Sequence, residues 1–140
     1  MQGRLLKKNT ARDGNMADLI GTAICLLFIL VIVITSVHFY KMLVVKRNID
    51  NVARGYLLTM EEQGELTDSD ISNLKTEIGQ MGFSDIEVNN NNGVKSDHGE
   101  RIVLGVTVRA TRQELGLSKV YDYIKDTYTF ETTLYSTSKN

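Results

Sequence analysis

Paired carboxylates are the residues of this chain whose type and spacing come closest to a catalytic pattern. Glu61 and Glu62 are adjacent, and Asp68 and Asp70 lie two positions apart. Such pairs can supply a general acid and a general base. The first pair falls at the end of a predicted helix and the second in a helix-capping segment, where carboxylates commonly face water. We therefore interpret both pairs as solvated groups and predict a non-enzymatic protein.

The sequence lacks the residue patterns that metal binding and nucleophilic catalysis require. Residues 89–93 (NNNNG), followed by Asp97, lack the spacing and terminal glutamate of an EF-hand, so their composition predicts a flexible turn. His38 and His98 have no partners at zinc-ligand spacing, and the single cysteine, Cys25, cannot form an intrachain disulfide. No nucleophile motif or phosphate loop is found. The sequence predicts no cofactor, no metal and no small-molecule substrate.

An uncharged apolar run then dominates the first third of the chain. The 22 residues from Leu19 to Tyr40 contain no Asp, Glu, Lys or Arg. As a helix they would extend roughly 33 Å, which matches a hydrocarbon core of about 30 Å. A cleaved secretory signal would have a shorter apolar region and a small-x-small site, absent here before His38. A lipoprotein site at Cys25 would need a small residue in place of Ile24, so we predict a transmembrane helix.

Basic residues flank this segment on both sides, so charge alone does not set its orientation. The segment before it is short, whereas the remainder has the length and strand content of a folded exported domain. We therefore expect a single-pass protein of the cell membrane, with a cytoplasmic amino terminus and an extracytoplasmic head. Charges beside a span serve topology and anionic lipid, so no nucleic-acid partner is expected. The flanking residues are Arg4, Lys7, Lys8 and Arg12 before the run, and Lys41, Lys46, Arg47 and Arg54 after it.

Helical periodicity continues beyond the apolar run as an amphipathic stalk. No proline interrupts the chain, so Asp18 to about Gln63 is predicted to form one helix of roughly 70 Å. Its outer half carries one apolar stripe with spacings of four, three, four and four residues. This stripe can pack on the protein's own head or on copies of itself in a filament. Its members are Val45, Ile49, Val52, Tyr56 and Met60.

The residues after Gly64 predict a small α+β head. Residues 67–70 (TDSD) offer N-cap candidates for a second amphipathic helix, with Gly82 as its C-cap. Strands are predicted at 83–88, 101–112 and 126–136, while 115–124 is a short helix or a loop. The expected fold is one helix on a three- to four-stranded antiparallel sheet. The predicted organisation is a leader (1–14), a transmembrane helix and stalk (15–63) and a head (64–140).

This layout resembles the type IV pilin-like proteins, most closely the TadE-like pseudopilins of tight-adherence and conjugative systems. The residues that carry the resemblance are a basic leader ending in Gly14 and an acidic residue, Asp18, just inside the apolar helix. In that family a prepilin peptidase cuts after the glycine, and a glutamate at the fifth mature position neutralises a neighbouring subunit's new amino terminus. The resemblance implies cleavage between Gly14 and Asn15, with Asp18 in the acidic role.

Two residues depart from the family pattern in three ways. Asp18 would be the fourth mature residue and is not Glu, and Asn15 would stand where a hydrophobic residue is usual. An uncleaved relative of the family also accommodates these departures.

The resemblance implies a structural minor pilin or pseudopilin. Its partners would be membrane lipid, other pilin-like subunits or an assembly platform, and a prepilin peptidase. The alternative is a bitopic accessory subunit of a conjugation or secretion channel.

Overall fold

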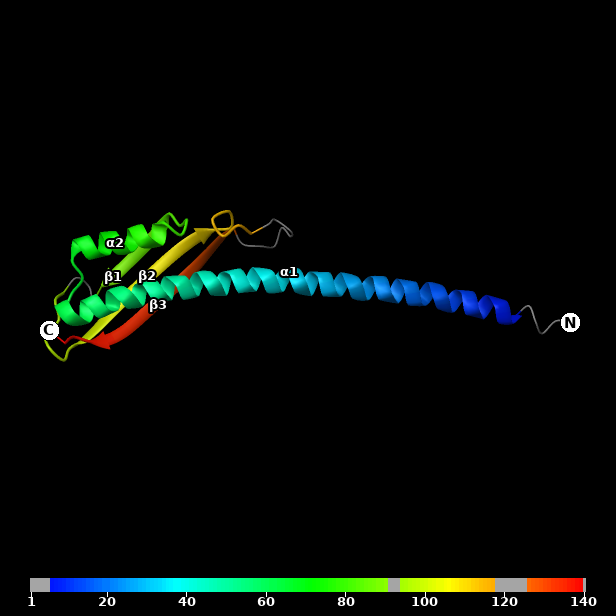
Figure 1. The fold of residues 1–140 in the computed structure, drawn as a ribbon, viewed down its shortest axis with the longest axis horizontal. Coiled ribbons are helices and arrows are strands. Elements are labelled where there is room, and N and C mark those ends of the chain that lie inside the picture. The colour runs from blue at the N-terminus through cyan, green and yellow to red at the C-terminus, as the bar shows by residue number, and fades with distance from the viewer. Residues whose placement is uncertain (1–5, 91–93, 118–125, 140) are drawn as a thin grey trace. The chain divides into compact units, whose positions relative to one another are not determined.

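The computed structural model describes residues 6–90, 94–117 and 126–139, and the side chains of the first helix from Asn15 onward. These residues form two helices and three strands, which are labelled in Figure 1. They are α1 (Leu6–Gln63), α2 (Asp68–Gly79), β1 (Asp85–Asn90), β2 (Arg101–Thr111) and β3 (Thr127–Thr137). This confirms the predicted α+β class, with a long apolar helix at the start and a three-stranded antiparallel sheet. The chain divides into two compact units, one ending at Tyr40 and one beginning at Lys41.

The unit that ends at Tyr40 consists of the apolar part of α1. Among the described residues, α1 is the one helix long and apolar enough to cross a membrane. Its hydroxyl groups bond to the helix itself, because Thr22 donates to the Asp18 carbonyl (2.7 Å) and Ser36 to the Ile32 carbonyl (2.7 Å). Such back-bonding satisfies a hydroxyl where water is absent, which suits an apolar surrounding.

The unit that begins at Lys41 is organised around β2. This central strand pairs antiparallel with β1 and with β3, so that Val88 faces Val106 and Val108 faces Phe130. Successive side chains of a strand point to opposite faces. Burial alternates accordingly: even-numbered residues of β2 are buried and odd-numbered ones are more exposed. One sheet face therefore belongs to the core and the other is open.

The remaining part of α1 covers the buried face. Ile49, Ala53 and Met60 of α1 are fully buried in one cluster with the even-numbered residues of β2. Helix α2 adds Leu74 and Ile78 to the same cluster. This packing explains why residues 41–63 of α1 belong to the same compact unit as the sheet. The buried β2 residues are Ile102, Leu104, Val106, Val108 and Ala110.

Helix α2 begins as predicted and ends earlier. Thr67 is its N-cap and forms a capping box with Asp70, whose carboxylate accepts from the Thr67 backbone N–H (3.1 Å). The predicted C-cap at Gly82 is wrong, because the helix ends at Gly79 and Gln80 is the C-cap. Backbone bonds of i to i+3 type tighten the chain directly after Gly79. Gly82 instead supplies a positive φ of 98° in the following turn.

The first strand lies two residues later than predicted. Phe83 is buried but precedes β1, whereas Asn89 and Asn90, expected in a turn, pair with Gly105 and Leu104. Pairing with β2 overrides the turn preference of asparagine at these two positions. Residues 91–93 of the predicted turn lie outside the described residues, as do residues 118–124 of the uncertain segment 115–124.

Replacement of Ile49 by Ala should show how much the unit depends on the contact between α1 and the sheet. The side chain is fully buried, so the change should lower the free energy of unfolding by roughly 2–5 kcal/mol. Leu58→Ala is the matched control, since Leu58 is 59% exposed on the same helix and should change stability by less than about 0.5 kcal/mol. Urea unfolding of the detergent-solubilised chain measures both. An equal loss of unfolding free energy in the Ile49 and Leu58 variants would contradict the packing of α1 on the sheet.

Candidate functional site

The residues predicted to direct processing and assembly lie within α1. Gly14 and Asn15 are both inside this helix, and Asn15 and Asp18 are exposed. The sequence predicted a helix that begins at Asp18, but α1 begins at Leu6. Asp18 therefore lies within the helix and not at its amino terminus. No ion pair or side-chain hydrogen bond of Asp18 occurs among the described residues. Its carboxylate therefore has no described countercharge in this chain.

The apolar side chains that follow Asp18 are also exposed. Leu19, Phe28 and Phe39 expose 68%, 67% and 64% of their surface. A soluble protein rarely presents a continuous apolar surface of this extent. The surface is chemically suited to lipid or to apolar helices of other subunits.

The five predicted stalk residues lie in the protein's own core. Ile49 and Met60 are fully buried, while Val45, Val52 and Tyr56 are partly buried against the same cluster. The apolar stripe therefore covers the sheet of its own chain. Any contact of residues 41–63 with another copy has to use the opposite, exposed side of the helix.

A polar network joins the middle of α1 to β3. The Lys46 ammonium donates to the Glu131 carbonyl (2.5 Å) and to the Thr132 hydroxyl (3.1 Å), and it pairs with Asp50 (3.4 Å). The Thr132 hydroxyl donates in turn to the Asp50 carboxylate. These bonds join residues more than 80 positions apart, and they fix the position of α1 along the last strand.

Glu61 forms a second polar tie, at the end of α1. Its carboxylate accepts from the Ser136 hydroxyl and from the Lys139 ammonium (2.5 Å), while the Lys139 backbone N–H donates to the Glu61 carbonyl (2.7 Å). Hydrogen bonds from Lys139 and Ser136 hold the pKa of Glu61 below its ordinary value of 4.5. The interpretation of Glu61 as a solvated group is therefore wrong, because the carboxylate is buried by the returning carboxyl-terminal segment. The adjacent Glu62 is exposed.

Glu114 connects the turn after β2 to the segment before β1. Its carboxylate accepts from the Thr111 backbone N–H (2.6 Å) and hydroxyl (2.9 Å), and from the Ser84 hydroxyl (2.8 Å). The bond from the Thr111 backbone, followed by those from Ser84 and the Thr111 hydroxyl, lowers the pKa of Glu114 from its ordinary value. This carboxylate therefore acts as a local clamp.

The other carboxylates considered for chemistry do not converge on one point. Asp70 is occupied in the capping box of α2, and Asp68 lies exposed in the first turn of that helix. Within the part of the chain that the structure describes, no group of three or more His, Cys, Asp or Glu side chains could hold a metal ion.

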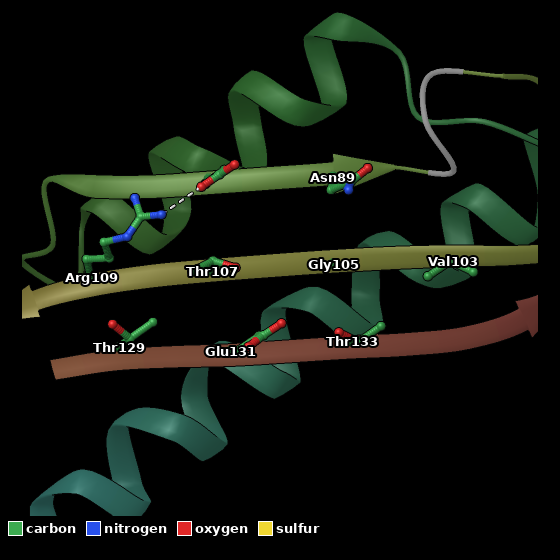
Figure 2. Close-up of a pocket in the computed structure, with 9 residues that line it drawn as sticks. Asn89, Val103, Gly105, Thr107, Arg109, Thr129, Glu131 and Thr133 are labelled. Carbon is green, nitrogen blue, oxygen red and sulfur yellow. Dashed lines mark hydrogen bonds and ion pairs between the residues drawn. The ribbon is translucent and has the colours of Figure 1, made fainter.

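The open face of the sheet forms a shallow hollow of about 550 Å³. Figure 2 shows that its side chains point away from both helices, which lie behind the sheet. Gly105 lies at its centre, between Asn89 of β1 and Thr133 of β3. Arg109 pairs with Glu87 (3.0 Å) and Asp85 (3.4 Å) at one end. The lining residues are Glu87, Asn89, Val103, Gly105, Thr107, Arg109, Thr129, Glu131 and Thr133.

No family model, curated protein or solved structure matches this chain.

Sequence reasoning missed the two ties between α1 and β3. Lys46 and Thr132 are 86 positions apart, and Glu61 and Lys139 are 78 apart, so no local pattern connects them. The open sheet face did have a signal, because strand alternation places Gly105 and Arg109 on the same face. The pairing of β2 with β1 and β3 was needed to show which residues surround Gly105.

Glu61→Gln should remove a pH-dependent part of the stability of the unit. Since folding lowers the pKa of Glu61, its stabilising effect is present above pH 4.5 and is lost as pH falls below that value. The variant should melt at a lower temperature at pH 7 and lose less stability on acidification than the parent. Thermal unfolding between pH 3 and pH 7 measures this, with Glu62→Gln as the exposed control. If the melting temperature of the Glu61 variant depends on pH as that of the parent does, the stabilising contact of Glu61 with Ser136 and Lys139 is refuted.

Proposed function

We propose that this protein is a structural, membrane-anchored minor pilin or pseudopilin of a type IV pilus-like, tight-adherence or conjugation assembly. The observation that carries the proposal is the double character of α1. Residues 16–44 of this helix present an exposed apolar surface, while residues 49–60 build the core of an α+β unit. One element thus supplies both a membrane anchor and the scaffold of a displayed domain.

Asp18 supports the proposal through its charge and its surroundings. A carboxylate beside an apolar helix is costly in lipid unless it meets a cation. Among the described residues it meets none, so a partner from outside the chain is expected to supply the charge. Cleavage after Gly14 would create that cation, the new ammonium group at Asn15 of a neighbouring copy. It would also place Asp18 in the first turn of the shortened helix, where a carboxylate is stabilised.

The proposed placement follows from the same division of the chain. The apolar part of α1 would cross the cell membrane once, with the amino terminus in the cytoplasm and the α+β unit outside. The expected partners are membrane lipid, other pilin-like subunits or an assembly platform, and a prepilin peptidase. The hydroxyl groups of Thr22 and Ser36, bonded within the helix, suit this lipid environment.

The mature amino terminus tests processing. Mass spectrometry of protein purified from the producing cell's membranes should show a chain that begins at Asn15. Gly14→Val should leave the full-length chain, because the residue before the cleaved bond is then too large, whereas Gly3→Val should be processed normally. A chain that begins at Met1 in the parent protein would contradict cleavage.

Asp18→Ala should separate membrane insertion from assembly. The variant should remain in the membrane after carbonate extraction, since its apolar surface is intact, but it should be lost from sheared surface filaments. Asp18→Glu should retain assembly because the charge is kept, and Asp13→Ala serves as the control within the leader.

The location of the parent protein decides between the two functions. Recovery of the parent in sheared filaments supports a pilin-like subunit. Recovery only with the membrane fraction would instead indicate an accessory subunit of a channel.

A further inference from the structure

Two open surfaces of the unit that begins at Lys41 have opposite charge. The first, here called the open sheet face, is the hollow around Gly105. The second, here called the outer helix stripe, lies on α1 opposite the buried stripe. Its exposed members are Arg47, Asn51, Arg54, Gly55 and Leu58. Neither surface contributes to the core.

The glycine at the centre of the open sheet face has no steric cause within the chain. A Cβ added at Gly105 would lie 3.6 Å from the Cβ and the carbonyl oxygen of Asn89, which is ordinary contact. Glycine nevertheless weakens the interior of a strand, and it often marks a point where another molecule approaches closely. Gly105 therefore leaves room for a group from outside the chain.

The same face has an uncompensated negative charge. Glu87 is paired with Arg109, but the Glu131 carboxylate has no cation within hydrogen-bond reach among the described residues. Glu131 stands on β3 with Thr129 and Thr133, and Thr107 lies opposite it on β2. Figure 2 shows these groups on the viewer's side of the sheet. The face is thus suited to a cationic side chain that also donates hydrogen bonds to the threonine hydroxyls.

The outer helix stripe has the complementary features. Arg47 and Arg54 are exposed, and neither forms an ion pair within the described part of the chain. Gly55 follows Arg54 in the helix interior, and a Cβ there would meet nothing within 4 Å. Leu58, one turn later, exposes 59% of its surface. Two free guanidinium groups, a glycine and a leucine thus face outward together.

We propose that the outer helix stripe of one copy docks on the open sheet face of a second copy, with Arg54 pairing with Glu131. A guanidinium group can bond to a carboxylate and to hydroxyl groups at once, as the threonines around Glu131 allow. The two surfaces differ, so the contact is heterologous and can repeat from copy to copy, as a filament of the proposed assembly requires. This inference rests on the proposed function, because it names the surfaces through which neighbouring subunits would associate.

Directed cross-linking tests the contact. In a Cys25→Ser background, one tagged chain has Asn51→Cys and a second, differently tagged chain has Thr133→Cys. Full-length chains are co-produced and treated with a short bis-maleimide in membranes and in sheared filaments. A product with both tags is expected, and a Ser72→Cys chain, changed on the exposed side of α2, should not replace Asn51→Cys. Absence of the mixed product, or equal yield with Ser72→Cys, would overturn the proposal.

Charge reversal tests the pairing. Arg54→Glu and Glu131→Arg should each lower the yield of mixed product roughly two- to fivefold, the range for one solvent-accessible ion pair. The combination of both changes should restore it. Arg47→Glu with Glu131→Arg is the matched control for the choice of Arg54. If Arg54→Glu combined with Glu131→Arg does not restore cross-linking, the pair of Arg54 with Glu131 is refuted. If only Arg47→Glu combined with Glu131→Arg restores it, the partner of Glu131 is Arg47.

Gly105→Thr tests the room at the centre of the sheet face. Threonine favours a strand, so the melting temperature of the unit should stay equal or rise. The mixed product should nevertheless be lost, because the added side chain occupies the hollow. Retained cross-linking would show that no close approach occurs at Gly105.

The outcomes separate this inference from the proposed function. If filaments form and the cross-linking and charge-reversal variants behave like their controls, the contact is wrong and the pilin-like function stands. If the parent protein keeps Met1 as its first residue and is found only in the membrane fraction, the pilin-like function fails. The cross-linked product with both tags then decides whether copies associate within the membrane.

Discussion

Burial of one apolar stripe of α1 against the even-numbered residues of β2 is the contact on which the folded unit depends. Ile49, Ala53 and Met60 meet five consecutive inward-facing positions of the central strand. Each large aliphatic side chain buried in this way contributes roughly 1.5–3 kcal/mol. Without α1, only the short helix α2 would cover this face of the three-stranded sheet, and so small a core is too little for stability. The helix is therefore part of the domain and cannot be regarded as a mere tether.

Two polar ties give this apolar contact its register. Apolar burial is non-directional, so it leaves the position of the helix along the sheet loosely specified. Lys46 and Asp50 bind Thr132, and further along the helix Glu61 binds Ser136 and Lys139. Among the described residues, no buried side-chain nitrogen or oxygen lacks a hydrogen-bond partner. Both sets of polar contacts involve β3, so this last strand determines the position of residues 46–61 of α1 along the sheet.

Local patterns in the sequence were sufficient for the elements and insufficient for their ends. The α+β class, the long helix, its buried stripe and the start of α2 at Thr67 were predictable, because periodicity and capping are properties of short segments. The end of α2 and the inclusion of Asn89 and Asn90 in β1 depend on neighbours in the fold. The same holds for Glu61, which resembles an exposed residue until the carboxyl-terminal segment returns to cover it.

For the candidate site too, local features were predictable from the sequence and contacts between distant segments were not. The expected roles of Gly14, Asn15 and Asp18 in processing and assembly come from the resemblance to pilin-like proteins, which compares their positions relative to the apolar run. The alternation of side chains along the predicted strand 101–112 also puts Gly105 and Arg109 on one face. It could not show that Arg109 is neutralised by Asp85 and Glu87 while Glu131 is left without a cation, because these relations arise from the pairing of three strands.

The dependence of α1 on β3 has a consequence for biosynthesis. The helix is made early and its partner strand last, and the tie between Glu61 and Lys139 spans 78 positions. The contacts of α1 with β3 and Lys139 consequently form only after almost the whole chain has left the ribosome. Closing so long a loop is slow, and exposed apolar surface promotes aggregation in the interval. Shielding of residues 45–60 by a chaperone or by the translocation machinery during this interval would reduce that risk.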